Sequence, residues 1–102
     1  MPIEDPKIRT TMELTVDLMA WLREYAAERR MSLNAAANLA FRTYIEANRK
    51  PDRTPPDGLR TRTTIAVPLS VLESLDAIAE ENGVSRTHVM IDAVRNLRGD
   101  AR

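Results

Sequence analysis

The chain has 102 residues, and its 15 basic and 15 acidic side chains leave no net charge at pH 7. This length allows one small domain, or two subdomains that share a core. The absence of cysteine excludes a disulfide framework and thiolate metal sites, and no apolar run is long enough to span a membrane. The first six residues do not resemble a signal peptide, so we expect a cytoplasmic protein.

Residues 7–14 alternate between apolar and polar side chains, which predicts a half-buried strand. One face carries Ile8, Thr10, Met12 and Leu14, and the other carries Lys7, Arg9, Thr11 and Glu13. An isolated strand is not stable in water, so this one requires a partner strand.

Two helices are predicted after this strand. Thr15 stands where an N-cap is expected, before an amphipathic run that ends near Ala26. Trp21 in this run is expected in the core or at its edge, although it could instead be an exposed anchor for a second molecule. Ser32 is the predicted N-cap of the second helix.

The connector between the two halves covers residues 49–58. It contains three prolines and the turn signal Asp57-Gly58. A second alternating segment follows at 60–67, and its polar face carries Arg60, Arg62, Thr64 and Ala66. This segment is the natural partner for the first strand.

Two further helices follow the second strand. Pro68 ends the strand, and Ser70 with Glu73 forms a capping-box pattern for the next helix. Gly83 suits a left-handed C-terminal stop, after which Ser85 is expected to cap the last helix. His88 is expected to be an exposed polar residue.

The two halves repeat each other. Shifting the sequence by 53 residues without a gap places 9–45 over 62–98, and nine of these 37 pairs are identical. Apolar residues also face apolar residues at each predicted element. Arg30 lies over Gly83 in this shift, so the backbone of the corresponding turn in the first copy is expected to be more strained. Such a repeat indicates one supersecondary unit used twice.

Strand, helix, tight turn and serine-capped helix resemble the ribbon-helix-helix (Arc/MetJ-like) family of DNA-binding proteins. The segments that carry the resemblance best are Arg62–Pro68 and Ala79–Ser85. The resemblance implies a mainly α fold with a short two-stranded antiparallel ribbon, formed by two tandem units as an intramolecular pseudo-dimer. The units would be residues 1–48 and 59–102, joined by the Pro-rich linker 49–58. The alternative, in which the strands of two separate chains pair with each other, is left open.

In this family the ribbon enters the major groove of double-stranded DNA, which is wide enough to admit it. The resemblance then implies six base-contacting residues: Arg9, Thr11, Glu13, Arg62, Thr64 and Ala66. Glu13 is the main departure, because phosphates repel a carboxylate. It could accept from cytosine, form a salt bridge with Arg9, or mark a copy that has lost base reading.

The start of each second helix would hold a DNA phosphate, since its unpaired N–H groups and dipole favour an anion. The implied phosphate-contacting residues are Lys7, Ser32, Leu33, Asn34, Arg60, Ser85, Arg86 and Thr87. Arg86 adds a charge that Leu33 lacks, so the two copies are expected to be unequal.

The resulting hypothesis is a sequence-specific DNA-binding protein, a transcriptional repressor or autoregulator in a bacterial, plasmid or phage setting. The alternatives are a relaxosome accessory protein and an antitoxin-type or other protein-interaction module with a toxin partner. Two chains could also associate with each other when they bind DNA. No nucleophile–base pair, glycine-rich phosphate loop or metal spacing is present, so we expect no enzyme activity, metal or cofactor.

Overall fold

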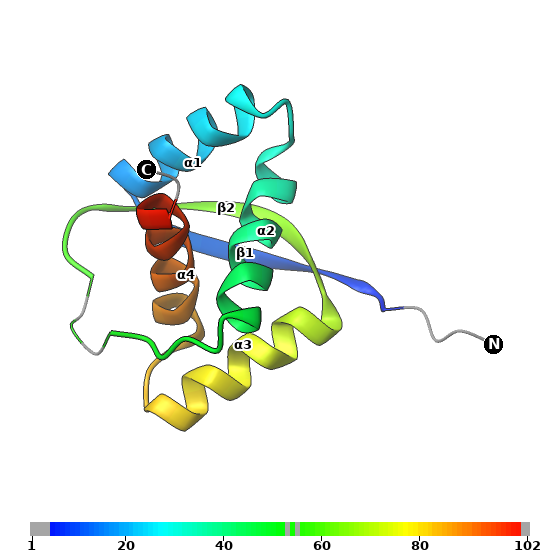
Figure 1. Cartoon of the computed structure of the whole chain (residues 1–102), viewed down its shortest axis with the longest axis vertical. Coiled ribbons are helices and arrows are strands. Elements are labelled where there is room, and N and C mark those ends of the chain that lie inside the picture. Colours follow the sequence, from blue (N-terminus) through cyan, green and yellow to red (C-terminus); the bar gives the residue numbers. More distant parts are fainter. Residues whose placement is uncertain (1–4, 53, 55, 101–102) are drawn as a thin grey trace.

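The computed structural model describes residues 5–52, 54 and 56–100. Within them, a strand and two helices are followed by the connector and then by a second strand and two more helices (Figure 1). The elements are β1 (Lys7–Thr15), α1 (Val16–Glu28), α2 (Leu33–Glu46), β2 (Arg60–Pro68), α3 (Leu69–Asn82) and α4 (Arg86–Asp100). The predicted mainly helical fold with a short two-stranded ribbon is confirmed.

The ribbon is an antiparallel sheet of β1 and β2 from the same chain. Its register pairs Lys7 with Pro68 at one end and Thr15 with Arg60 at the other. Thr11 faces Thr64 at the centre of the ladder, and the 53-residue shift also places these two residues over each other. The ladder is therefore centred on a pair of equivalent positions.

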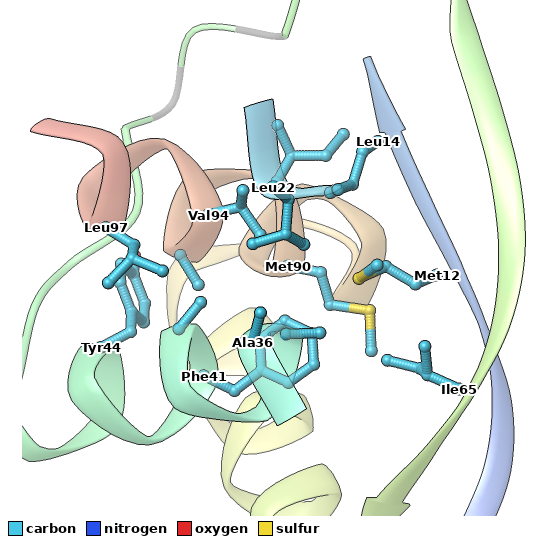
Figure 2. Close-up of a cluster of buried hydrophobic side chains, with 14 of the residues drawn as sticks. Met12, Leu14, Leu22, Ala36, Phe41, Tyr44, Ile65, Met90, Val94 and Leu97 are labelled. Carbon is cyan, nitrogen blue, oxygen red and sulfur yellow. The ribbon is translucent and has the colours of Figure 1, made fainter. Parts of the chain in front are cut away.

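One face of the ribbon is buried. Met12 and Leu14 from β1, and Ile65 and Val67 from β2, are almost completely inaccessible. Figure 2 shows Met12, Leu14 and Ile65 directed toward side chains of α1 and α4, among them Leu22, Met90 and Val94. The predicted period-two pattern thus separates a core face from an open face.

The four helices pack against the buried face of the ribbon. α2 and α4 lie next to each other at the centre, while α1 and α3 lie toward opposite ends (Figure 1). A single hydrophobic core contains residues from both strands and all four helices, including Phe41 and Tyr44 of α2. Each half alone is too short for such a core, so the two halves stabilise each other.

The starts of α1 and α3 differ from the sequence prediction. Thr15 occupies the N-cap position of α1, but its side chain makes no capping hydrogen bond. The capping box of Ser70 and Glu73 is wrong, because α3 already begins at Leu69 and Ser70 lies inside it. Instead, the Asp5 carboxylate accepts from the Ser70 backbone N–H at 3.0 Å and from the Ser70 hydroxyl.

The residue just before each strand accepts a hydrogen bond from the start of the first helix of the other half. Leu69 N–H donates to the Pro6 carbonyl at 2.8 Å, and Val16 N–H donates to the Leu59 carbonyl at 2.9 Å. The two bonds join equivalent positions under the 53-residue shift. They extend the ribbon past its last ladder pair and satisfy one N–H group at the start of each helix.

The turns between the paired helices follow the prediction. Gly83 has a left-handed backbone with φ of 66°, and Arg30 adopts the same conformation with φ of 55°. The Ser32 hydroxyl accepts from Ala35 N–H at 3.0 Å, and the Ser85 hydroxyl accepts from His88 N–H at 3.1 Å. Both serines are therefore N-caps, as predicted.

The connector packs along α4. Arg49 donates to Asn96 at 2.8 Å and forms an ion pair with Asp100 at 3.4 Å. The His88 ring contacts the Asp52 carbonyl oxygen, so His88 is partly buried rather than exposed as predicted. Pro51 is buried.

Candidate nucleic-acid interface

The open face of the ribbon brings together all six predicted base-contacting residues. They form three cross-strand pairs, which are Arg9 with Ala66, Thr11 with Thr64, and Glu13 with Arg62. This arrangement follows from the period of two in each strand and from the antiparallel register. The ribbon therefore presents its polar residues as one continuous strip.

Most of this strip is accessible to a ligand. Arg9, Thr11, Arg62 and Thr64 are exposed, whereas Glu13 and Ala66 are partly buried. Arginine and threonine side chains can donate hydrogen bonds to base edges, and the threonine methyl can contact thymine.

Glu13 is bound by two arginines of the opposite strand. Arg62 Nε donates to Glu13 Oε2 at 2.8 Å, and Arg60 Nη1 donates to Glu13 Oε1 at 2.9 Å. The hypothesis of a salt bridge to Arg9 in the same strand is wrong. The reason is the register, which places Arg62 directly opposite Glu13 and Arg60 two residues earlier in β2, on the same face.

These contacts favour the ionised form of the carboxylate. The hydrogen bond from Arg60, followed by that from Arg62, lowers the pKa of Glu13 below its usual range. Glu13 is therefore an anion at neutral pH. At this end of the ribbon, one negative charge accompanies two positive ones.

The opposite end of the ribbon is held by asparagines of α2. The Asn34 side chain accepts from the Ala66 backbone N–H at 2.6 Å and donates to the Ala66 carbonyl at 3.2 Å. Asn38 Nδ2 donates to the same carbonyl at 3.0 Å. These bonds satisfy backbone groups at the edge of β2 and fix the distance between the ribbon and the start of α2.

An open depression of about 480 Å³ lies at the start of α2. Its lining contains Lys7, Ser32, Asn34 and Arg42. Three predicted phosphate-contacting residues are thus close together, although the Asn34 side chain is already engaged with β2. Leu33 packs against the core, so only its backbone N–H is suited to an anion.

The start of α4 has a different environment. Arg86 Nε and Nη2 donate to the two carboxylate oxygens of Asp76 on α3, and the longer of these bonds is 2.8 Å. The hydrogen bond from Arg86 lowers the pKa of Asp76, and the pKa of Arg86 is raised in return. The expected advantage of Arg86 for phosphate is therefore offset by Asp76. Ser85 is exposed and Thr87 is partly buried at this helix start.

Sequence reasoning missed several residues that shape this surface. Asn38 had a usable signal, because it is a polar residue within the otherwise apolar stripe of Ala36, Ala37 and Ala40. Asp76 gave no such signal, since its pairing with Arg86 depends on how α3 and α4 cross. The capping role of Asp5 depends in the same way on the antiparallel register.

Two other kinds of site are absent from the described part of the chain. No group of three or more histidine or acidic residues there could hold a metal ion. None of the helices described is both long and apolar enough to cross a membrane.

Comparison with known families agrees with the geometry of the second half. Residues 61–100, which comprise nearly all of β2 together with α3 and α4, form a ribbon-helix-helix unit. The family whose profile they match is the ribbon-helix-helix proteins of the copG family. Members of this family are generally DNA-binding transcription regulators. No curated protein and no solved structure matches the chain.

Proposed function

We propose that this protein binds specific sequences in double-stranded DNA by inserting the β1–β2 ribbon into the major groove. Its role would be that of a transcriptional repressor or autoregulator. The observation that carries the proposal is the exposed strip of cross-strand pairs centred on Thr11 and Thr64. A two-stranded ribbon fits the groove, which is about 12 Å wide.

In this proposal the two halves are tandem ribbon-helix-helix units, residues 1–48 and 59–102, joined by the linker 49–58. One chain then supplies both strands of the ribbon and acts as a pseudo-dimer. The matching order of elements supports this interpretation, as does the position of Thr11 opposite Thr64. Two such chains could occupy adjacent sites on DNA.

The proposed contacts fall into two groups with different tasks. The side chains of the open ribbon face contact base edges and provide specificity. Lys7 and the starts of α2 and α4 contact phosphates and fix the ribbon in the groove. The lining of the depression at the start of α2 supports this role for Lys7 and Ser32.

The proposal is tested by selecting binding sites from a pool of random duplexes and measuring affinity at two salt concentrations. We expect a defined preferred sequence and an affinity that falls as salt rises. Arg62→Ala should lose about 1–3 kcal/mol of discrimination at one base pair. Lys7→Ala should weaken binding to all sequences equally and reduce the salt slope by about one.

Arg23→Ala is the matched control, because Arg23 is an exposed arginine of α1 outside the ribbon. It should bind like the parent protein. The absence of any preferred duplex would reject the proposed function. If Arg62→Ala and Lys7→Ala both bind like the parent, the assignment of contacts is wrong even though DNA binding stands.

A further inference from the structure

The two ends of the open ribbon face differ in charge. At one end, Arg60 and Arg62 are both hydrogen-bonded to Glu13. At the other end, Lys7 and Arg9 form no ion pair with any residue that the structure describes. The position equivalent to Glu13 in the second half is Ala66, whose methyl group cannot accept a hydrogen bond.

Glu13 holds Arg62 in a particular orientation. The carboxylate accepts from Nε of Arg62, and no hydrogen bond within the described ranges involves its terminal Nη groups. The Arg62 side chain is 75% exposed, while that of Glu13 is only 19% exposed. The guanidinium is thus fixed at its base, with two donor groups available to an external acceptor pair.

Such an orientation favours one base. Guanine presents O6 and N7 side by side in the major groove, and a fixed arginine can donate to both. An arginine already held in place also loses less conformational entropy on binding than a mobile one. Arg9 lies opposite Ala66 and lacks this support, so its side chain can adapt to several acceptors.

The carboxylate also affects binding that does not depend on sequence. A negative charge on the groove-facing surface is repelled by DNA phosphates and reduces affinity for every duplex. Glu13 therefore lowers general affinity at its own end of the ribbon. The Lys7–Arg9 end keeps its full positive charge.

We propose that Glu13 is a positioning residue that gives the ribbon a direction on DNA. The Arg62 end selects guanine, whereas the Lys7–Arg9 end discriminates less between bases. The preferred site is then an asymmetric duplex that is bound in one orientation. This inference rests on the proposed DNA-binding function.

The test exchanges the side chains at positions 13 and 66 and measures the orientation in which the protein binds DNA. The variants are Glu13→Ala, Ala66→Glu and the double exchange, each checked for intact folding by circular dichroism. Orientation is read by a DNA-cleaving iron chelate on a single introduced cysteine, because the chain has no other cysteine. The attachment sites are Glu28→Cys and, as its matched control, Glu81→Cys, which are exposed and equivalent under the shift.

In the parent background, the Glu28→Cys conjugate should cleave one flank of the selected site, and the Glu81→Cys conjugate the other. Glu13→Ala should lower discrimination at the guanine about tenfold. It should also bind random duplex more tightly and cleave both flanks. The double exchange should restore selectivity and reverse the cleaved flank. Glu13→Gln keeps an oxygen acceptor for Arg62 and should retain part of the orientation bias, which a purely structural role would not explain.

Equal cleavage of both flanks by the parent would overturn the inference, while the selected sequence would still support the proposed function. A double exchange that leaves the cleaved flank unchanged would also overturn it, since the direction would then have another origin. Failure to select any sequence would instead reject the proposed function itself.

Discussion

At the scale of single residues, equivalent positions of the two halves carry different side chains in the same backbone conformation. Arg30 and Gly83 both have positive φ and both lie in the turn that follows the first helix of their half. A left-handed backbone costs an ordinary L-residue about 1–2 kcal/mol, whereas glycine adopts it readily. Arg30 therefore stores local strain that Gly83 avoids.

Arg30→Gly should raise the free energy of unfolding by about 0.5–1 kcal/mol, because relief of strain exceeds the added flexibility of the unfolded chain. The reverse test is Gly83→Arg, which should destabilise by at least about 1 kcal/mol. A Cβ atom at Gly83 would meet nothing within 4 Å, so the expected loss comes from the backbone conformation. Urea denaturation measures both effects. A neutral or destabilising Arg30→Gly would mean that the arginine side chain makes a compensating contribution.

At the scale of elements, each helix start depends on a segment that is distant in sequence. The Asp5 carboxylate reaches the start of α3 and binds Ser70 there. The position equivalent to Asp5 is Gly58, which has no side chain, so α1 lacks this support. Helix capping is thus unequal in the two halves, although the helices themselves are similar.

Asp5→Ala should lower the urea midpoint at pH 7, because it leaves N–H groups at the start of α3 unpaired. The hydrogen bonds from Ser70 lower the pKa of Asp5, so its ionised form is favoured in the folded state. This contribution is complete above the unfolded pKa of about 4 and is lost as the pH falls through the lower folded value. The difference between parent and variant should accordingly shrink below about pH 4.

Asp57→Ala provides the control for this prediction, since Asp57 is an exposed acid of the connector. It should match the parent across the pH range. A pH-independent effect of Asp5→Ala would show that the carboxylate charge is not what stabilises α3.

At the scale of the whole molecule, a buried polar pair joins the two halves. The Tyr44 hydroxyl of α2 donates to Asp92 Oδ2 of α4 at 2.8 Å, deep in the packed region between these helices. Asn96 Nδ2 donates to the same carboxylate oxygen at 3.3 Å, and Arg95 lies 3.9 Å from the other. The 53-residue shift relates Tyr44 to Leu97 and Asp92 to Leu39. Two leucines therefore occupy the corresponding positions, and they cannot form such a hydrogen bond.

Tyr44→Phe should lower the free energy of unfolding by about 1–3 kcal/mol, because it removes a donor to a buried carboxylate. Burial, followed by the hydrogen bond to Asp92, raises the pKa of Tyr44 above its usual range. The parent should therefore lose stability as the pH rises above about 10, the pKa of an unfolded tyrosine, and the variant should lack that loss. Tyr25→Phe is the control, since no hydrogen bond of the Tyr25 hydroxyl is found among the described residues. Equal effects of the two substitutions would contradict the role assigned to the pair.

Much of the fold could be predicted from the sequence, because its determinants are local. Alternation defines both strands and their open faces, and spacing of apolar residues defines the helices. Ser32, Ser85 and Gly83 mark helix boundaries through their own side chains or backbone. The six ribbon residues could be placed on one face for the same reason, and their contact with DNA stays a prediction.

By itself, the sequence determined the elements and the polar strip of the ribbon. Only the tertiary structure decided which charges are matched: Glu13 with Arg60 and Arg62, and Arg86 with Asp76. These partners are brought together by cross-strand register and helix crossing, which no local pattern encodes. Their electrostatic consequences depend on separations of a few ångströms. The inequality between the two ends of the ribbon is therefore a property of the folded molecule, even though every residue that causes it is visible in the chain.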